Sequence, residues 1–314
     1  MKQFNFFRKL GSKPVQLLTF GILLGLSACK KDKDTQNQVT SPEAYRSLTQ
    51  AGLSSLMQTA TFNIDGGTFV FESNKGTMVY IHTDCLRKDG AAATGTARLE
   101  FYEAYEYADM VIANKATMGY NAENVLEPLR TGGQFFVRVT QDGAPLDTDC
   151  AISIETSCEH TGGYDGDMVG WIGQFIKDDL VWNQSDDVNV GANDRSEPGY
   201  FLEALEFGWF NIDKLYDDPR PRIPLNISVP VAYVEACTVY AIIKGEPYSL
   251  GLAGYGEWPI GLEIYLIFVS ENNGQYQWEI KEHTVQQGQT INFNLANAQT
   301  GNITQLRNAL SALQ

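Results

Sequence analysis

The chain has 314 residues, of which 43% are hydrophobic and 19% are charged, so it can bury a substantial core and is not a disordered protein. Its formal charge is −15, from 23 basic and 38 acidic residues. Nucleic-acid binding needs a basic surface, and this charge therefore argues against a nucleic-acid partner. The 29 glycines and the 11% aromatic content favour β-structure with many turns.

Residues 1–28 have the pattern of a secretory signal, because four basic residues precede a short apolar stretch from Val15 to Leu26. The segment Leu26-Ser27-Ala28-Cys29 resembles the lipobox of bacterial lipoproteins. That resemblance implies cleavage before Cys29, a diacylglycerol on its thiol and acylation of its new amine. The alternatives are an ordinary secretory signal and a transmembrane anchor, for which the apolar stretch is short. Cleavage would leave 19 basic and 38 acidic residues, a charge of −19.

Residues 29–40 are charged and rich in amides, with no apolar face, and they predict a flexible tether. Position two, with Cys29 counted as position one, is Lys30 and not the aspartate that keeps enteric lipoproteins at the inner membrane. We therefore expect an outer-membrane lipoprotein, with the side it faces left open. Its predicted partners are the membrane, through the lipid on Cys29, and an envelope protein or glycan.

Four cysteines remain after Cys29, and an even number in an exported chain allows two disulfides in three pairings. Cys150 and Cys158 are eight residues apart, with Ser153, Glu155 and Thr156 in an expected turn between them, which makes them the disulfide candidates. The alternative is that the cysteines are small buried thiols. A zinc site from Cys150, Cys158 and His160 would lack paired short spacings and a fourth ligand. The four are Cys85, Cys150, Cys158 and Cys237.

Residues 41–216 are predicted to form a domain that begins with one short helix over 41–60 and continues as an antiparallel β-sandwich. The alternation of apolar and polar residues supports this, with a helix at 103–115 as the alternative to a strand there. Crowded Gly, Asp and Asn predict a loop-rich insertion near 155–200, followed by a buried strand at 207–213. The expected strands lie at 68–71, 77–82, 95–102, 134–140 and 150–154.

Three prolines within 219–224 indicate a linker, and residues 225–314 are predicted to form a second β-sandwich domain. The Asn272-Asn273-Gly274 step between two alternating segments is a strong hairpin signal. Ile303, Leu306, Leu310 and Leu313 predict a C-terminal amphipathic helix. The fold class is therefore mainly β, with two antiparallel sandwiches and a helix near each end. The expected strands lie at 226–235, 237–243, 261–269, 275–283 and 289–295.

Four segments of the first half resemble a family of Bacteroidetes envelope lipoproteins. The resemblance implies a sandwich similar to the domain of ankyrins and netrin receptors, and it implies no catalytic residues. The second half resembles a carboxypeptidase-regulatory or immunoglobulin-like module. The segments are Gly76-Thr77-Met78-Val79-Tyr80-Ile81, residues 97–111, Gly132-Gly133-Gln134-Phe135-Phe136-Val137 and Gly208-Trp209-Phe210-Asn211-Ile212-Asp213.

Few residues carry recognisable chemistry. No Gly-x-Ser-x-Gly or His-Glu-x-x-His motif is present, so a catalytic triad would have to use His82, His160 or His283. His82 and His283 lie on expected strands, where a structural role is more common. We therefore expect no catalytic residues and no required cofactor.

Two further groups of residues suggest ligands. Asp165, Asp167, Asp186, Asp187 and Asp194 lie in segments rich in Gly and Asn, and their oxygens are weak candidates for calcium. Aspartates in turns more often cap their own backbone. The aromatic residues Tyr255, Trp258 and Tyr265 could stack on sugars, although such residues are more often core.

The leading hypothesis is a lipid-anchored envelope protein that works by protein or glycan contact and not by catalysis. The rivals are a calcium-dependent envelope hydrolase, a glycan-binding protein and a structural part of a larger envelope assembly. An enzyme needs convergent titratable groups in a pocket. The observation that separates these hypotheses is whether a concave site is lined by one of the three histidines.

Overall fold

The computed structural model describes residues 40–193 and 198–313. The signal segment 1–28, Cys29, all of the tether except Thr40, and Asp194 lie outside the described residues. Residues 38–314 make one compact unit, so the contacts give no domain boundary at 217–224. Within the described part of the chain, no helix has the length and apolar character needed to cross a membrane.

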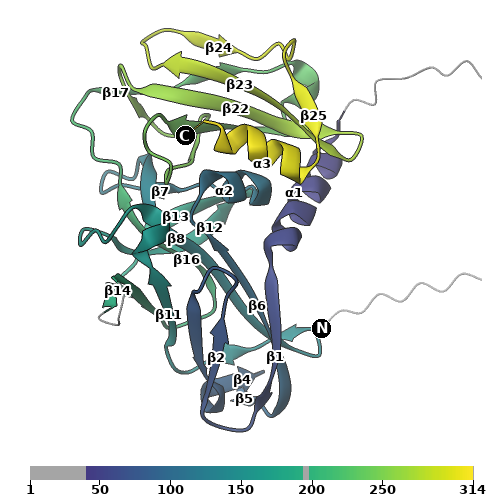
Figure 1. Ribbon diagram of the computed structural model, residues 1–314, viewed down its shortest axis with the longest axis vertical. Helices are drawn as coiled ribbons and strands as arrows, with labels where there is room; N and C mark the ends of the chain where they lie inside the picture. The colour runs from purple at the N-terminus through teal and green to yellow at the C-terminus, as the bar shows by residue number, and fades with distance from the viewer. Residues whose placement is uncertain (1–39, 194–197, 314) are drawn as a thin grey trace, which may run out of the picture. The chain divides into compact units, whose positions relative to one another are not determined.

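An eight-stranded central sheet runs through the fold in the order β1-β6-β8-β16-β12-β13-β7, and β9 pairs with the end of β8 (Figure 1). The long strand β8 also pairs with β7 through its first residues, so this end of the sheet closes on itself. The strands are β1 (Gln58–Ile64), β6 (Gly95–Ala104), β7 (Met118–Tyr120), β8 (Leu126–Gln141), β9 (Ala144–Pro145), β12 (Val169–Ile176), β13 (Asp179–Gln184) and β16 (Gly208–Leu215).

A five-stranded outer sheet covers one face of the central sheet in the order β14-β15-β11-β3-β2, and all its pairings are antiparallel. Its strands are β2 (Thr68–Glu72), β3 (Met78–His82), β11 (Ile152–Ser157), β14 (Val188–Asn193) and β15 (Gly199–Ala204). A small sheet flanks it, formed by β4 (Leu86–Lys88), β5 (Ala91–Ala92) and β10 (Asp147–Thr148). The first half of the chain thus contains the expected β-sandwich.

A C-terminal sheet has the order β20-β19-β22-β23-β25, and its long hairpin β22–β23 confirms the strongest turn prediction. Asn273 and Gly274 have φ values of 52° and 77°, as a type I′ turn requires at both central residues. The strands are β19 (Cys237–Ile243), β20 (Gly251–Leu252), β22 (Glu263–Asn272), β23 (Gln275–Thr284) and β25 (Gln299–Gly301). Two short pairs accompany them, β17 (Arg222–Ile223) with β21 (Trp258–Pro259), and β18 (Asn226–Ser228) with β24 (Thr290–Asn292).

Three helices lie between the C-terminal sheet and the central sheet (Figure 1). Helix α1 (Pro42–Leu56) begins as predicted, with the Ser41 side chain capping the Ala44 backbone amide at 3.1 Å. Helix α2 (Tyr107–Ala113) lies within 103–115, where a helix was the alternative considered, and Asn114 ends it in the left-handed region. Helix α3 (Ile303–Ser311) is the predicted C-terminal helix, and it buries Leu306 and Leu310.

Two hydrophobic cores result, one on each face of the central sheet. On β6, Phe101 packs into the core shared with the outer sheet, while the next residue, Tyr102, packs into the core shared with the helices. The second core also contains Trp182 from the first half of the chain and Ile267 from the second half. This second core contains residues from both sides of the segment 217–224. The proline-rich segment therefore does not separate two independent cores.

The segment 155–200 was expected to be mainly loop, and this prediction is wrong because it contains three complete strands, β12 to β14, together with the second half of β11 and the start of β15. Its glycines are needed for close strand packing. A Cβ on Gly170 would lie 2.1 Å from the Val188 carbonyl oxygen, and one on Gly173 would lie 2.6 Å from the Trp209 Cβ.

The disulfide prediction is also corrected. Cys150 is bonded to Cys85, which lies 65 residues earlier in the short 3₁₀ turn η1 (Thr83–Cys85). Cys158 instead begins a second such turn, η2 (Cys158–Thr161), as a buried free thiol, and its Sγ lies 3.0 Å from the Pro198 carbonyl oxygen. Cys237 is also free. The bridge joins the segment after β3 to the segment before β11, two strands that are neighbours in the outer sheet.

Candidate functional site

The acidic residues considered for calcium are not gathered into one site. The Lys214 Nζ lies 2.5 Å from the Asp165 carboxylate and donates the hydrogen bond that lowers the pKa of that carboxyl below its usual range. Asp165 also accepts a hydrogen bond of 3.0 Å from the Asp167 backbone amide. Asp186 and Asp187 are exposed in a turn. Across residues 40–193 and 198–313, no three His, Cys, Asp or Glu side chains are placed to hold a metal ion.

The three aromatic residues considered for sugar stacking do not form a platform. Trp258 is fully buried, which agrees with the more common role of such residues in the core and not with stacking on a sugar. The Tyr255 hydroxyl donates to Asp179 at 2.7 Å, and the Tyr265 ring lies 4.9 Å from the Nζ of Lys244 on the C-terminal sheet. A stacking surface needs ring faces that share one open plane, and these three residues do not provide one.

The three histidines have different surroundings. His82 is exposed at the end of β3, and its Nδ1 lies 3.1 Å from the Thr68 hydroxyl. His283 is half-buried on β23, and burial lowers the pKa of its imidazole. Of the three histidines, only His160 lines the cavity between the β-sandwich and the C-terminal sheet.

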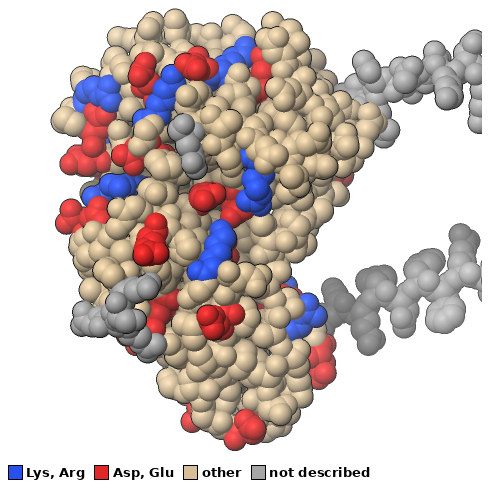
Figure 2. Space-filling model, viewed as in Figure 1, with Lys and Arg blue, Asp and Glu red and all other residues tan. Residues whose placement is uncertain are grey.

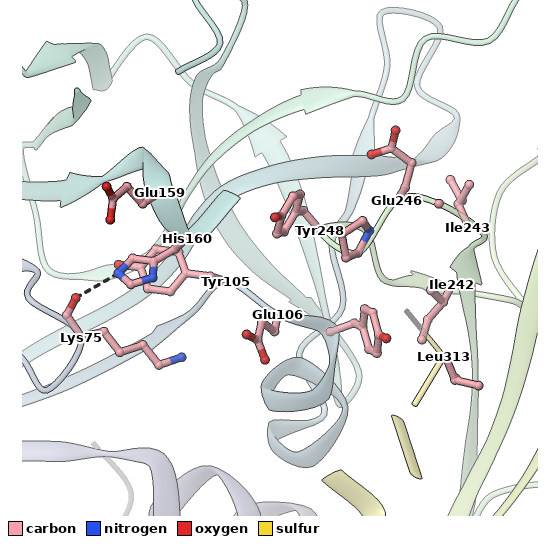
Figure 3. Close-up of a pocket in the computed structure, with 13 residues that line it drawn as sticks. Lys75, Tyr105, Glu106, Glu159, His160, Ile242, Ile243, Glu246, Tyr248 and Leu313 are labelled. Atoms are coloured by element: carbon pink, nitrogen blue, oxygen red, sulfur yellow. Dashed lines mark hydrogen bonds between the residues drawn. The ribbon is translucent and has the colours of Figure 1, made fainter. Parts of the chain in front are cut away.

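This cavity, which we call the His160 cavity, has a volume of about 700 Å³ and lies where the β-sandwich meets the C-terminal sheet (Figure 3). One wall comes from the β2–β3 turn, the start of α2 and the turn η2. The opposite wall comes from the end of β19 and the loop that follows it. The lining residues used below are Lys75, Tyr105, Glu106, Glu159, His160, Glu246 and Tyr248.

His160 and Tyr105 form a rigid aromatic wall of this cavity. Their rings stack with centroids 4.5 Å apart, and the His160 Nε2 lies 3.0 Å from the Lys75 carbonyl oxygen (Figure 3). A carbonyl oxygen only accepts hydrogen bonds, so Nε2 carries the proton. The Tyr248 ring packs closely against Gly162, at the end of η2. A Cβ added to Gly162 would lie only 3.2 Å from the Tyr248 Cε2.

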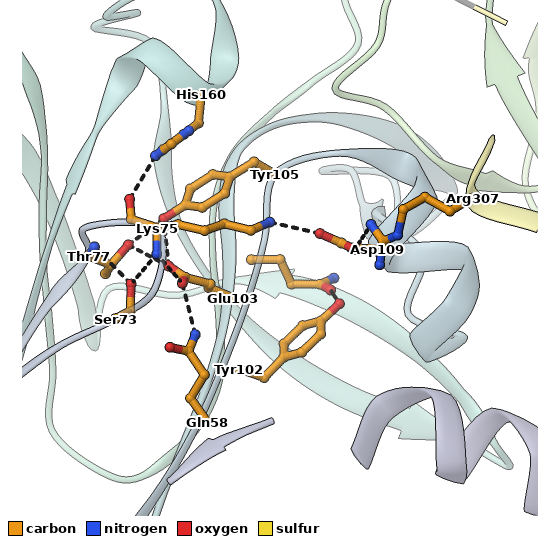
Figure 4. A network of polar contacts seen from close by, with 11 residues as sticks. Gln58, Ser73, Lys75, Thr77, Tyr102, Glu103, Tyr105, Asp109, His160 and Arg307 are labelled. Atoms are coloured by element: carbon orange, nitrogen blue, oxygen red, sulfur yellow. Dashed lines mark hydrogen bonds and ion pairs between the residues drawn. The ribbon is translucent and has the colours of Figure 1, made fainter. Parts of the chain in front are cut away.

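A buried hydrogen-bond network holds Tyr105 from behind (Figure 4). The Tyr105 hydroxyl lies 2.5 Å from the Thr77 hydroxyl, 2.6 Å from the Thr156 hydroxyl and 3.2 Å from the Glu103 carboxylate. The second oxygen of Glu103 accepts from the Gln58 amide at 3.0 Å. Burial, and then the charge of Glu103, raise the pKa of Tyr105. Tyr105 is therefore a neutral, fixed phenol that supplies a ring face.

A second buried carboxylate, Asp109 on α2, ties this wall to the C-terminal helix. Its two oxygens pair with the Lys75 Nζ at 2.7 Å and with Arg307 on α3 (Figure 4). The Lys75 ammonium is thus neutralised from inside the fold. It also lies 5.3 Å from the Tyr105 ring centroid.

The remaining charges at the cavity are acidic. Within the described residues, no cationic side chain pairs with Glu106 or Glu159, which are exposed at its edge. Glu246 lies 3.5 Å from Arg130. The lining therefore presents an excess of negative charge beside aromatic ring faces. Elsewhere on the face shown in Figure 2, acidic and basic side chains are interspersed, and no continuous basic surface is present among its described residues.

Aliphatic hydroxyl and thiol nucleophiles are not among the residues that line the cavity. Its lining contains no Ser, Thr or Cys side chain, and the hydroxyls of Thr77 and Thr156 are used in the network behind Tyr105. The nearby Cys158 is buried, and burial raises the pKa of its thiol. The arrangement is suited to holding a ligand between charge and ring faces.

The sequence suggested His160 as a weak zinc ligand and as one of three histidines available to a catalytic triad, but it did not locate this cavity. Its lining comes from five separate stretches between Lys75 and Leu313, and none carries a motif. The one available signal was the clustering of aromatic and acidic residues at Tyr105-Glu106-Tyr107 and Glu246-Pro247-Tyr248.

A second cavity, of about 920 Å³, lies at the start of α1. It is lined by Pro42, Tyr45 and Arg46 on one side and by Val229 and Val234 on the other. Burial raises the pKa of Tyr45. Residues at the start of α1 and residues of the segment before β19 therefore lie on opposite sides of one cavity.

One buried lysine lies apart from both cavities. The Lys115 side chain is only 8% exposed, and its Nζ lies 5.3 Å from the Phe175 ring centroid and 5.7 Å from that of Trp209. It donates to the Asn114 carbonyl oxygen at 3.2 Å. No carboxylate in the described part of the chain forms an ion pair with it, and burial lowers its pKa to about 8.

No protein-family model, curated protein or solved structure matches this chain significantly. The resemblance of its segments to Bacteroidetes envelope lipoproteins therefore stays a prediction.

Proposed function

We propose that this chain is a lipid-anchored protein of the outer membrane that binds an amine-bearing ligand in the His160 cavity without transforming it. The anchor follows from Leu26-Ser27-Ala28-Cys29, in which a cysteine thiol follows small residues at the end of a secretory signal. Lys30, directly after Cys29, supports the outer membrane as the destination.

The observation that carries the binding proposal is the unneutralised acidic edge beside fixed aromatic rings. Glu106 and Glu159 have no cationic partner among the described residues, while Tyr105 and His160 present a wall held by buried hydrogen bonds. Carboxylates and aromatic faces together favour a cationic ligand by charge and by cation–π attraction. No serine, threonine or cysteine lines the cavity, which supports binding over hydrolysis by one of these nucleophiles.

The anchor is tested by metabolic labelling with a fatty-acid analogue. Cys29→Ser should abolish the label, because the thiol is the lipid acceptor, while Cys237→Ser serves as the matched control and should keep it. A label retained on Cys29→Ser would refute the lipid anchor.

The binding site is tested by calorimetry with two matched probes, a glucosamine tetramer and its N-acetylated form. The charged tetramer should bind and the neutral one should not. Glu159→Gln should weaken binding about fivefold, as expected from about 1 kcal/mol of lost charge attraction. Glu206→Gln, an exposed glutamate outside the cavity, is the control. Equal binding of both tetramers would point to sugar recognition, and cleavage of either would point to a hydrolase.

A further inference from the structure

A short apolar turn projects from the surface before β19. It contains the 3₁₀ turn η3 (Val231–Tyr233), and we call residues 229–234 the valine turn. Val231 is 90% exposed and Val234 is 63% exposed, with Ala232 also exposed between them. Single exposed apolar residues are common, but several together on one projecting turn mark a contact surface.

The valine turn is held in place by Tyr233, so Val231 and Val234 do not fold back onto the core. The Tyr233 hydroxyl donates to Gln277 at 3.0 Å, and its ring packs edge-on against Phe268 with centroids 5.4 Å apart. Two backbone hydrogen bonds close the turn, from Tyr233 to Pro230 at 2.8 Å and from Ala236 to Tyr233 at 3.0 Å. Tyr233 therefore packs against the C-terminal sheet, while Val231 and Val234 point outward.

The turn lies where the chain leaves the described body toward Cys29. Val234 lines the second cavity together with Pro42 at the start of α1. Thr40, the first described residue, donates its hydroxyl hydrogen to Glu271 at the end of β22. Eleven residue steps separate Cys29 from Thr40, and an extended chain of that length spans at most about 40 Å. A lipid on Cys29 would therefore keep this end of the protein close to the bilayer.

We propose that the valine turn inserts Val231 and Val234 into the surface of the bilayer that holds the Cys29 lipid. This inference rests on the lipid anchor of the proposed function. The anchor supplies a high local concentration of membrane, so a contact that is weak by itself is populated. The turn carries one charged neighbour, the acidic Glu235, and no basic residue. Its attraction to lipid is therefore apolar and should not depend on anionic lipids.

The test uses the full lipidated chain in phosphatidylcholine vesicles whose acyl chains are brominated, which quenches tryptophan fluorescence at the bilayer. All five native tryptophans are buried, with at most 8% exposure, so Val231→Trp adds the one exposed indole. Val70→Trp is the matched control, because Val70 is 46% exposed on β2 at the other end of the fold (Figure 1). The Val231→Trp indole should be quenched at least threefold more than the Val70→Trp indole, in low and high salt alike.

Vesicle flotation of the same samples separates the two proposals. Flotation with equal quenching of the two indoles would overturn the valine turn as a membrane contact and leave the anchor standing. Quenching that disappears in 1 M salt would overturn the apolar contact. Failure of both variants to float would refute the anchor, and the membrane contact with it.

Discussion

Removing the Cys85–Cys150 disulfide should lower the free energy of unfolding substantially. The bridge spans 65 residues, and closing a loop of that length in the unfolded chain corresponds to about 4 kcal/mol in the chain-entropy model. The spacing-based pairing of Cys150 with Cys158 would close a loop of eight residues and contribute only about 2.5 kcal/mol. The double variant Cys85→Ala with Cys150→Ala is the direct test.

The measurement is guanidinium unfolding of the full chain with and without reductant, followed by tryptophan fluorescence. The wild type should lose about 4 kcal/mol on reduction, and the double variant should show no further loss. Cys158→Ala is the control, because it removes a buried thiol but leaves the bridge, so its sensitivity to reductant should match that of the wild type.

Two results would refute this reasoning. One is a Cys158→Ala protein that no longer responds to reductant, which would place Cys158 in the bridge. The other is a non-reduced proteolytic digest in which the peptide that contains Cys85 migrates alone. A loss below about 1 kcal/mol on reduction would show that the bridge constrains the unfolded chain far less than its length implies.

Three other changes should alter stability in stated directions, each measured by chemical unfolding of the full chain. Gly52→Ala should cost about 2 kcal/mol, because the new Cβ would lie 2.3 Å from the Ile112 carbonyl oxygen where α1 crosses α2. Lys115→Met should stabilise the protein below pH 8. The folded-state pKa of Lys115, about 8, lies below the usual lysine value of about 10.5, so the buried ammonium costs about 3 kcal/mol below pH 8. That cost disappears as the pH rises from 8 to 10.5. Asp109→Asn should cost about 2 kcal/mol, because it removes the charge that Lys75 and Arg307 share, two side chains that are each about one-third exposed.

Each of these changes has an outcome that contradicts it. Ser54→Ala changes an exposed residue on α1 and should be nearly neutral, so it is the control for Gly52→Ala. A Gly52→Ala protein as stable as this control would show that α1 and α2 can move apart at no cost. A Lys115→Met protein whose stability still rises between pH 8 and 10.5 as steeply as the wild type would place that titration elsewhere. An unchanged free energy of unfolding for Asp109→Asn would show that solvent screens the ion pairs of Asp109 with Lys75 and Arg307.

Local sequence signals determined the elements whose cause is local. The Asn273-Gly274 turn follows from the two positive φ values that this pair tolerates, and α1 follows from the Ser41 cap before Pro42. The period of Leu306 and Leu310 likewise predicted α3 and its buried face. These signals need only neighbouring residues, so the sequence was sufficient to predict them.

The tertiary structure alone decided which distant residues meet. Cys150 pairs with Cys85 and not with the nearby Cys158, because the pairing of β3 with β11 brings the ends of those strands together. Gly170 looked like a loop residue, yet it lies in a strand where the Val188 backbone leaves no room for a Cβ. The His160 cavity combines side chains from both halves of the chain, and no local pattern records that meeting, because packing across the shared core creates it.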